Sequence, residues 1–335
     1  MRFVWERIFF VHLVVVFLMI DHMRRSGLVI LFLSLLMGLT GCSFKVTKPM
    51  LQVALSKSMK VSTKVAFADS LEKRIGLPYV QDGDPAQVLD IYYAKDSVRK
   101  DAVLVDIHGG FYVAGRRENK RRFASYFLKE GYDVVLLEYR LNDGTRDVAD
   151  ELSDCAAGLD YLATHARELG LNPDRMFLTG DSAGGHLALY MAEGIENKSM
   201  PIRPKVFRSR GVLLNCPAYD YAMFPEVESL AESTIAWFMG PRYKDKELMQ
   251  TLSPRTYIGT YSGPLFLSTC KHDFIRSESL LLKADCDSLS RPLDFVDIDS
   301  NDRRVRHVHN VSNPGLSESK EVNARMAAFL DKYLE

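Results

Sequence analysis

The pentapeptide Gly-Asp-Ser-Ala-Gly at residues 180–184 constrains the fold of this chain more than any other segment. An apolar run at 176–179 precedes it, and a helical pattern at 186–192 follows it. A tight turn between a strand and a helix leaves no space for Cβ atoms at its flanks, which explains the two glycines. The turn would hold Ser182 at the carboxyl edge of a sheet, which predicts a nucleophile. The alternative is a tight turn without a catalytic role.

Strand-like and helical patterns alternate through most of the chain. Eight apolar runs are expected to form strands: residues 77–81, 88–93, 102–107, 134–139, 176–179, 212–215, 265–269 and 293–298. From residue 102 onward the runs lack polar alternation, which predicts strands buried on both faces. Amphipathic patterns at 148–162 and 322–330 predict helices. The predicted fold class is α/β, with a mostly parallel eight-stranded sheet and helices on both faces.

The amino-terminal region differs from the rest of the chain. Two apolar runs, 8–20 and 28–39, are separated by a basic pair, and the second run ends in Leu-Thr-Gly before Cys42. This pattern resembles a bacterial lipobox, in which the cysteine is lipidated. Residues 1–41 are therefore expected to be a signal peptide, with 1–22 an over-extended start of translation. The alternative is an uncleaved membrane anchor made of one or both runs.

The expected lipid on Cys42 would tether the protein to a membrane outside the cytoplasm of a bacterium. Residues 42–75 are polar with scattered apolar positions, which predicts a tether and a lead-in helix, and residues 76–335 are expected to form the folded domain. The stretch 217–263 is too long for a simple crossover between strands. Its aromatic residues predict a small cap above the carboxyl edge of the sheet, where ligands bind in such folds.

Composition limits the possible partners. Lysine plus arginine equals aspartate plus glutamate, with 43 of each among 335 residues, so the basic excess typical of nucleic-acid binding is missing. The cysteines that follow Cys42 lie in apolar segments without short-spaced pairs, which predicts buried free thiols. They are Cys155, Cys216, Cys270 and Cys286. The sequence contains no recognisable cluster of metal ligands, so neither a metal nor another cofactor is expected.

A second glycine-rich turn follows the apolar run at 102–107 and reads His108, Gly109, Gly110, Phe111. Successive glycines let backbone N–H groups approach a substrate oxygen closely. Such donors can stabilise an oxyanion by about 3 kcal/mol each. The alternative is a glycine-rich turn without a ligand, and His108 itself is expected to be structural.

The combination of these two turns resembles the α/β-hydrolase esterases, in particular the hormone-sensitive-lipase-like branch and related small carboxylesterases. The family usually has a third glycine where this chain has Phe111, a departure that resembles arylformamidase-like members. The resemblance covers residues 77–334 and implies the α/β-hydrolase fold. It also implies an oxyanion hole formed by the backbone amides of Gly109, Gly110 and Ala183.

The same resemblance implies a catalytic triad in the order serine, acid, histidine. Asp273 follows the apolar run at 265–269 and matches the family's acid. Three later aspartates are the alternatives: Asp294, Asp297 and Asp299. The histidine must come after the next strand, where His307 fits the family pattern better than His309 does.

These residues predict a serine hydrolase that cleaves carboxylic esters of small to medium acyl groups. Ser182 would attack the carbonyl, His307 would transfer the proton, and Asp273 would orient the imidazole. The expected partners are a small-molecule ester and, through Cys42, a membrane, with no nucleic acid. The alternatives are an arylformamidase-like amidase or a peptidase on the same fold, and a catalytically silent binding protein.

Overall fold

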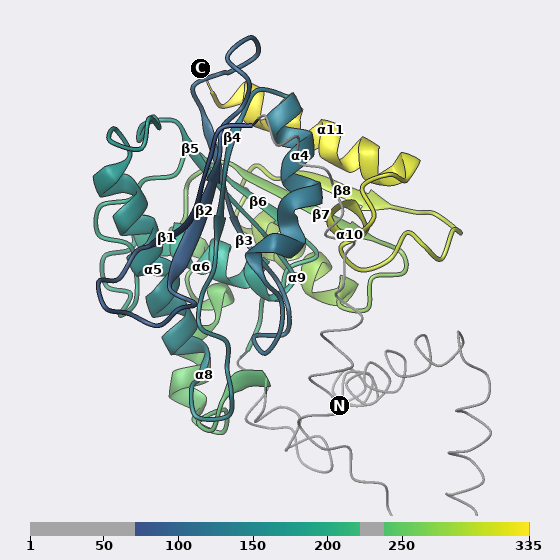
Figure 1. The fold of residues 1–335 in the computed structure, drawn as a ribbon. Helices are drawn as coiled ribbons and strands as arrows, with labels where there is room; N and C mark the ends of the chain where they lie inside the picture. Colours follow the sequence, from purple (N-terminus) through teal and green to yellow (C-terminus); the bar gives the residue numbers. More distant parts are fainter. Residues whose placement is uncertain (1–70, 222–237, 335) are drawn as a thin grey trace, which may run out of the picture.

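The computed structural model describes residues 71–221 and 238–334, which form one eight-stranded sheet (Figure 1). The strands are β1 (Lys73–Pro78), β2 (Val88–Tyr92), β3 (Val103–Ile107), β4 (Asp133–Leu137), β5 (Met176–Asp181), β6 (Val212–Asn215), β7 (Leu265–Cys270) and β8 (Asp294–Ile298). Their order across the sheet is β1-β2-β4-β3-β5-β6-β7-β8. β2 is antiparallel to both of its neighbours, and the remaining pairs are parallel. The predicted fold class is confirmed.

The first strand is where the prediction fails. β1 covers Lys73–Pro78 rather than 77–81, and it begins inside the stretch 42–75 for which a lead-in helix was expected. Most residues of β1 are exposed, since it lies at the edge of the sheet. An exposed edge strand carries no continuous apolar run, so the pattern could not locate it. Residues 42–70 of the expected tether lie outside the described residues.

Successive residues of the central strands point into two separate cores, because side chains alternate between the faces of a sheet. Val103 and Val105 of β3 belong to the core that also holds residues of α5 (Val148–His165), α6 (Ala183–Glu196) and α9 (Arg276–Ser288). Leu104 belongs to the opposite core, with residues of α4 (Arg121–Lys129) and α11 (Ser317–Lys332). Figure 1 shows α5 and α6 on one side of the sheet and α4 and α11 on the other. The shorter helices are η1 (Arg117–Lys120) and α10 (His309–Ser312).

Only part of the predicted cap, 217–263, is described. It contains α8 (Lys246–Leu252) and the short turns η3 (Pro254–Thr256) and η4 (Ile258–Thr260), and both turns contact α6. Residues 222–237 of the cap lie outside the described residues, as do the predicted signal peptide and Cys42. Within residues 71–221 and 238–334, no helix has both the length and the apolar character needed to cross a bilayer.

Candidate active site

Ser182 lies in the sharp turn between β5 and α6, with φ 54° and ψ −121°. A residue with a Cβ rarely adopts a positive φ, because the side chain crowds the backbone. The flanking glycines make the turn possible. A Cβ on Gly180 would lie 2.1 Å from the carbonyl oxygen of Gly184, and one on Gly184 would lie 2.1 Å from that of Ile107. The structure therefore contains the strained strand-to-helix turn that the pentapeptide predicts.

The neighbouring strand holds this turn in place. The N–H of Ser182 donates to the carbonyl oxygen of Asn215 at the end of β6, at 3.0 Å, and the N–H of Ala218 donates to the carbonyl oxygen of Ser182 at 3.1 Å. Ser182 keeps 8% of its surface exposed at the amino end of α6. A serine hydroxyl on a fixed backbone suits a nucleophile, provided that a base is near.

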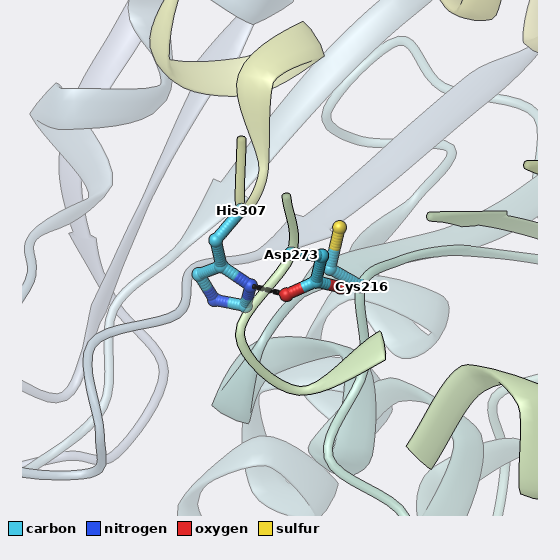
Figure 2. Close-up of side chains that lie close together, drawn as sticks. All are labelled: Cys216, Asp273 and His307. Atoms are coloured by element: carbon cyan, nitrogen blue, oxygen red, sulfur yellow. Dashed lines mark hydrogen bonds and ion pairs between the residues drawn. The ribbon is translucent and has the colours of Figure 1, made fainter. Parts of the chain in front are cut away.

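Asp273 and His307 meet on the loops that follow β7 and β8. These strands are parallel neighbours, and an isolated bridge between His272 and Arg306 continues the pairing beyond them. Asp273 and His307, the residues that directly follow this bridge, therefore lie beside each other. The Nδ1–H of His307 donates to Oδ1 of Asp273 at 2.6 Å (Figure 2). This bond fixes the tautomer that carries its proton on Nδ1 and leaves a lone pair on Nε2.

The carboxylate of Asp273 is buried and held from several sides. Besides His307, its Oδ1 accepts the N–H of Ile275 at 3.0 Å, and its Oδ2 accepts the hydroxyl of Thr269 at 2.9 Å. Burial raises the pKa of Asp273, but the His307 ring and the Ile275 hydrogen bond outweigh burial and leave the pKa below its usual value. Asp273 is therefore ionised at neutral pH, as a carboxylate that orients an imidazolium must be.

The other ring nitrogen of His307, Nε2, is buried and has no hydrogen-bond partner in the part of the chain that the structure describes. The structure thus brings the acid and the base together but shows no hydrogen bond between the base and Ser182. Asn215 links the serine turn to α10, which follows His307. Its backbone oxygen accepts the N–H of Ser182, and its Oδ1 accepts a hydrogen bond from Nδ2 of Asn310 at 2.7 Å. The hydrogen bond between a catalytic base and its nucleophile often tightens only when substrate binds.

The glycine loop after β3 lies directly against the serine turn. A Cβ on Gly109 would be 3.1 Å from the Cβ of Ser182. The expectation that Gly109 donates to an oxyanion is wrong, because its N–H already donates to Oδ1 of Asp181 at 3.1 Å. Among the described residues, several backbone amides of this region have no acceptor, and they include those of Gly110, Phe111 and Ala183.

Phe111 was missed as a candidate donor. It adopts a φ of 56°, the left-handed conformation that glycine usually takes. The family's third glycine stands at this position. The replacement of that glycine by Phe111 was the sequence signal from which this amide could have been identified. The backbone amide is present whatever the side chain is, and Phe111 keeps the glycine-like conformation. We therefore place the amides of Gly110 and Phe111, with that of Ala183, as the available donors.

His108 is structural, as expected. Its Nδ1–H donates to the carbonyl oxygen of Gly109 at 2.9 Å, its Nε2–H donates to Oε1 of Glu138 at 2.8 Å, and its ring stacks on Tyr139 at 4.3 Å. Both ring nitrogens face acceptors, so the ring is fully hydrogen-bonded only as the imidazolium. Burial lowers the pKa of His108, but Glu138 outweighs burial and raises it above its usual range. This pair holds the base of the glycine loop.

The alternative acids and base have other partners. Nδ1 of His309 lies 2.9 Å from Oγ of Ser319, and burial lowers the pKa of His309 to about 4. His309 is therefore a neutral core histidine bonded to α11 rather than to an aspartate. The alternative aspartates form ion pairs with Lys332 (Asp294), Arg276 (Asp297) and Lys271 (Asp299). Of the residues considered, Asp273 and His307 form the acid–base pair.

A row of aromatic rings lies against one side of the Asp273–His307 pair. The ring of Phe111 stacks on Phe238 at 5.2 Å and on Phe274 at 5.7 Å between centroids. Phe274 in turn lies 4.1 Å from the ring of His307. The glycine loop, the described edge of the cap and the histidine are thus joined by apolar contacts. An apolar group beside His307 would find favourable packing there.

One cluster near the site has the composition of a small metal centre. Sγ of Cys216, the Asp273 carboxylate and the His307 ring offer ligand atoms within 4.8 Å of one another (Figure 2). The Asp273 carboxylate, however, already accepts several hydrogen bonds. Burial, reinforced by the Asp273 charge, raises the pKa of the Cys216 thiol well above its usual value, so the thiol stays protonated and is a poor ligand. The cluster fits a hydrogen-bonded acid–base pair beside a buried thiol. All four cysteines in the described residues are free and buried, as expected.

Comparison with known proteins gives the family. The sequence model of the BD-FAE family matches residues 89–280, more than half of the chain. The chain belongs to the BD-FAE family. The matched region runs from β2 into α9, so it includes the glycine loop, the serine turn and Asp273.

Curated relatives of this BD-FAE protein match it over shorter stretches. A probable isoprenylcysteine alpha-carbonyl methylesterase of Arabidopsis thaliana is 30% identical over 116 residues, which are 33% of this chain and 24% of that protein. The probable carboxylic ester hydrolase LipM of Mycobacterium tuberculosis is 27% identical over 224 residues, which are 60% of this chain and 50% of that protein. The chain thus spans about a quarter of the first relative and half of the second.

Solved structures match over most of the chain. An inhibited form of esterase B from Lactobacillus rhamnosis has a TM-score of 0.73 at 25% identity and covers 84% of this chain and 92% of that one. A bacterial heroin esterase has a TM-score of 0.66 at 21% identity, covers 86% and 92% of the two chains, and shows the fold alone. Together with the sheet order and the family match, these likenesses identify an α/β-hydrolase of the hormone-sensitive-lipase-like esterase branch.

Proposed function

We propose that this protein hydrolyses carboxylic esters of small to medium acyl groups through an acyl-enzyme on Ser182. The observation that carries the proposal is the 2.6 Å hydrogen bond between Asp273 and His307. The loop that carries His307 and the strained serine turn are both bonded to residues 215–218, and the amides of Gly110, Phe111 and Ala183 have no acceptor among the described residues. The similar proteins support an ester as the substrate, since they include a methylesterase, a carboxylic ester hydrolase and an esterase.

In the first half-reaction, Oγ of Ser182 bonds to the carbonyl carbon while its proton moves to Nε2 of His307. The carbonyl oxygen becomes an oxyanion, which the available amides of the glycine loop and α6 would stabilise. When the tetrahedral intermediate collapses, the bond to the alcohol oxygen breaks and that oxygen takes the proton from Nε2. Asp273 stays ionised throughout and stabilises the transient imidazolium.

In the second half-reaction, water replaces the alcohol. His307 removes a proton from the water as it attacks the acyl carbon, and the proton then returns to Oγ of Ser182 when the acid leaves. The rings of Phe111, Phe238 and Phe274 provide apolar contacts for an acyl or alcohol group of modest size. Because the similar esterase B is known in a C6-C4 SN3 inhibited form, butyrate and hexanoate esters are the first substrates to test.

The decisive experiment uses the full chain, purified in detergent, with p-nitrophenyl esters from acetate to dodecanoate. We expect turnover to be highest at short and medium chains, and a fluorophosphonate probe to label the protein. Both should be lost in Ser182→Ala and kept in Ser153→Ala, which removes an exposed hydroxyl that donates to the carbonyl oxygen of Ala149 one turn earlier in α5. No turnover and no labelling would favour a silent binding protein, whereas faster cleavage of matched anilides would favour an amidase.

Membrane attachment through a lipid on Cys42 is part of the proposal. Its support is the sequence alone, in which an apolar run ends in Leu-Thr-Gly before this cysteine. Cys42→Ser should release the protein from the membrane fraction, and mass spectrometry should find a diacylglyceryl-modified amino-terminal cysteine in the wild type. An unmodified Cys42 in a membrane-bound protein would instead indicate an uncleaved apolar anchor.

A further inference from the structure

A buried lysine is bonded to the turns that form the candidate active site. Lys120, the last residue of η1, is only 3% exposed, although it lies in the charged stretch 116–122. Its Nζ is 2.5 Å from Oδ1 of Asp181 and 3.3 Å from Oδ1 of Asp106. An ammonium loses its hydration when it is buried, so these carboxylates are what keeps it charged there.

Asp181 links this lysine to both turns. It directly precedes Ser182, and the oxygen atom that faces the ammonium also accepts the N–H of Gly109 at 3.1 Å. Gly109 and Ser182 are packed so closely that a Cβ on Gly109 would contact the serine. A displacement of the Asp181 side chain would therefore shift the glycine loop relative to the nucleophile.

Asp106 adds a second carboxyl to the cluster. Both of its oxygens are buried and lack a hydrogen bond within the described residues, so Lys120 is its ion-pair partner there. Burial raises the pKa of Asp106 to about 6. Burial lowers the pKa of Lys120, but the two carboxyl groups outweigh burial and raise it above its usual value. Buried ion pairs add little stability compared with apolar residues of the same size, so a cluster of this kind calls for another explanation.

We infer that Lys120 is a positioning residue of the hydrolytic site, whose ammonium fixes Asp181 and thereby sets the glycine loop against Ser182. In that arrangement the amides of Gly110, Phe111 and Ala183 can face a single oxygen atom. The inference rests on the proposed ester hydrolysis. It assigns to Lys120 no contact with substrate, so its effect should be on stabilisation of the oxyanion rather than on substrate affinity.

The test compares Lys120→Met with the double variant Lys120→Met/Asp106→Asn. The single variant leaves two carboxyl groups buried without a cation and can fail to fold for that reason alone. The double variant removes the carboxylate of Asp106 together with the ammonium of Lys120, and it keeps Asp181. The matched control is Lys100→Met, since Nζ of Lys100 lies at the same 2.5 Å from Oδ1 of Asp331 but in a partly exposed pair.

We expect the folded double variant to lose kcat on p-nitrophenyl butyrate by about 10- to 100-fold, a share of what one lost oxyanion donor costs. KM should change less than about threefold, and a trifluoromethyl ketone that mimics the oxyanion should lose affinity by a factor similar to that of kcat. Lys100→Met should change neither kcat nor the affinity for the ketone.

A folded double variant with wild-type kcat and ketone affinity would overturn the inference, and so would failure of both Lys120 variants to fold, since the lysine would then serve stability alone. These results are distinct from failure of the proposed function. In that case the wild type itself would neither cleave the esters nor react with a fluorophosphonate.

Discussion

The side chains of Asp273 and His307 share a hydrogen bond of 2.6 Å although they lie 34 positions apart in the sequence. The parallel pairing of β7 with β8, continued by the bridge between His272 and Arg306, accounts for the contact. Because Nδ1 donates to the carboxylate, Nε2 is the nitrogen that can accept a proton from a nucleophile. Asp273 therefore sets the orientation of the His307 ring, with Nε2 free to act as the base.

Asp273→Asn should lower kcat for an ester substrate by about 10³- to 10⁴-fold, because an amide can hold the imidazole in the wrong tautomer and cannot stabilise the imidazolium. Asp297→Asn is the matched control, since Asp297 lies on β8 and pairs with Arg276. Initial rates and thermal unfolding of both variants check this. A loss below tenfold in folded Asp273→Asn would exclude Asp273 as the orienting acid.

The two neighbouring histidines should separate activity from stability. His307→Gln should lose at least about 10³-fold in kcat, with a small change in melting temperature, because the ring acts in the reaction. His309→Gln should keep most of kcat but lose about 1–3 kcal/mol of unfolding free energy, because the buried ring and its bond to Ser319 are removed. Urea denaturation with parallel kinetics measures both. A large loss of kcat in His309→Gln with little loss in His307→Gln would instead make His309 the base.

Much of the sheet could be predicted because the inner strands are buried on both faces and appear as continuous apolar runs. β3, for example, is entirely buried. β1 could not be located in this way, since its residues are mainly exposed and its pairing is specified by β2 alone. The order of Ser182, Asp273 and His307 was implied by the resemblance to the α/β-hydrolase esterases rather than by the strand pattern. Of these residues, the structure brings Asp273 and His307 into contact.

Two features of the site required coordinates. The sequence could not indicate that the Gly109 amide is bonded to Asp181, since that bond depends on how the loop approaches β5. Nor could it indicate which cation of the stretch 116–122 turns inward. The stretch also contains four arginines, none of which is fully buried, and the position of η1 beside Asp106 and Asp181 is what buries Lys120.

His186 should make stability fall with acid. It is fully buried, its Nε2–H donates to the carbonyl oxygen of Leu252 at 2.8 Å, and burial lowers its pKa to about 3. The folded pKa lies below the unfolded value of about 6.5, so the contribution is complete above pH 6.5 and is lost as pH falls toward 3. Between pH 6.5 and 5 the loss from this group is about 2 kcal/mol.

His186→Gln keeps a donor for Leu252 but does not titrate in this range. We expect its unfolding free energy, measured in urea, to decline about 2 kcal/mol less than that of the wild type between pH 6.5 and 5. Parallel curves for the two proteins would show that this buried histidine does not govern the acid sensitivity.

Phe111 should influence substrate size more than the chemical step. Its ring packs between Phe238 and Phe274, whereas its contribution to the proposed oxyanion hole is a backbone amide. Phe111→Gly keeps that amide and relieves a left-handed conformation that costs about 1 kcal/mol, so kcat on the acetate ester should change less than about threefold. KM for the hexanoate ester should rise about tenfold, because loss of the ring removes apolar contact worth about 1.4 kcal/mol. Phe111→Tyr, which retains the ring, should behave like the wild type with both esters. An equal change in KM for acetate and hexanoate would place the acyl chain away from these rings.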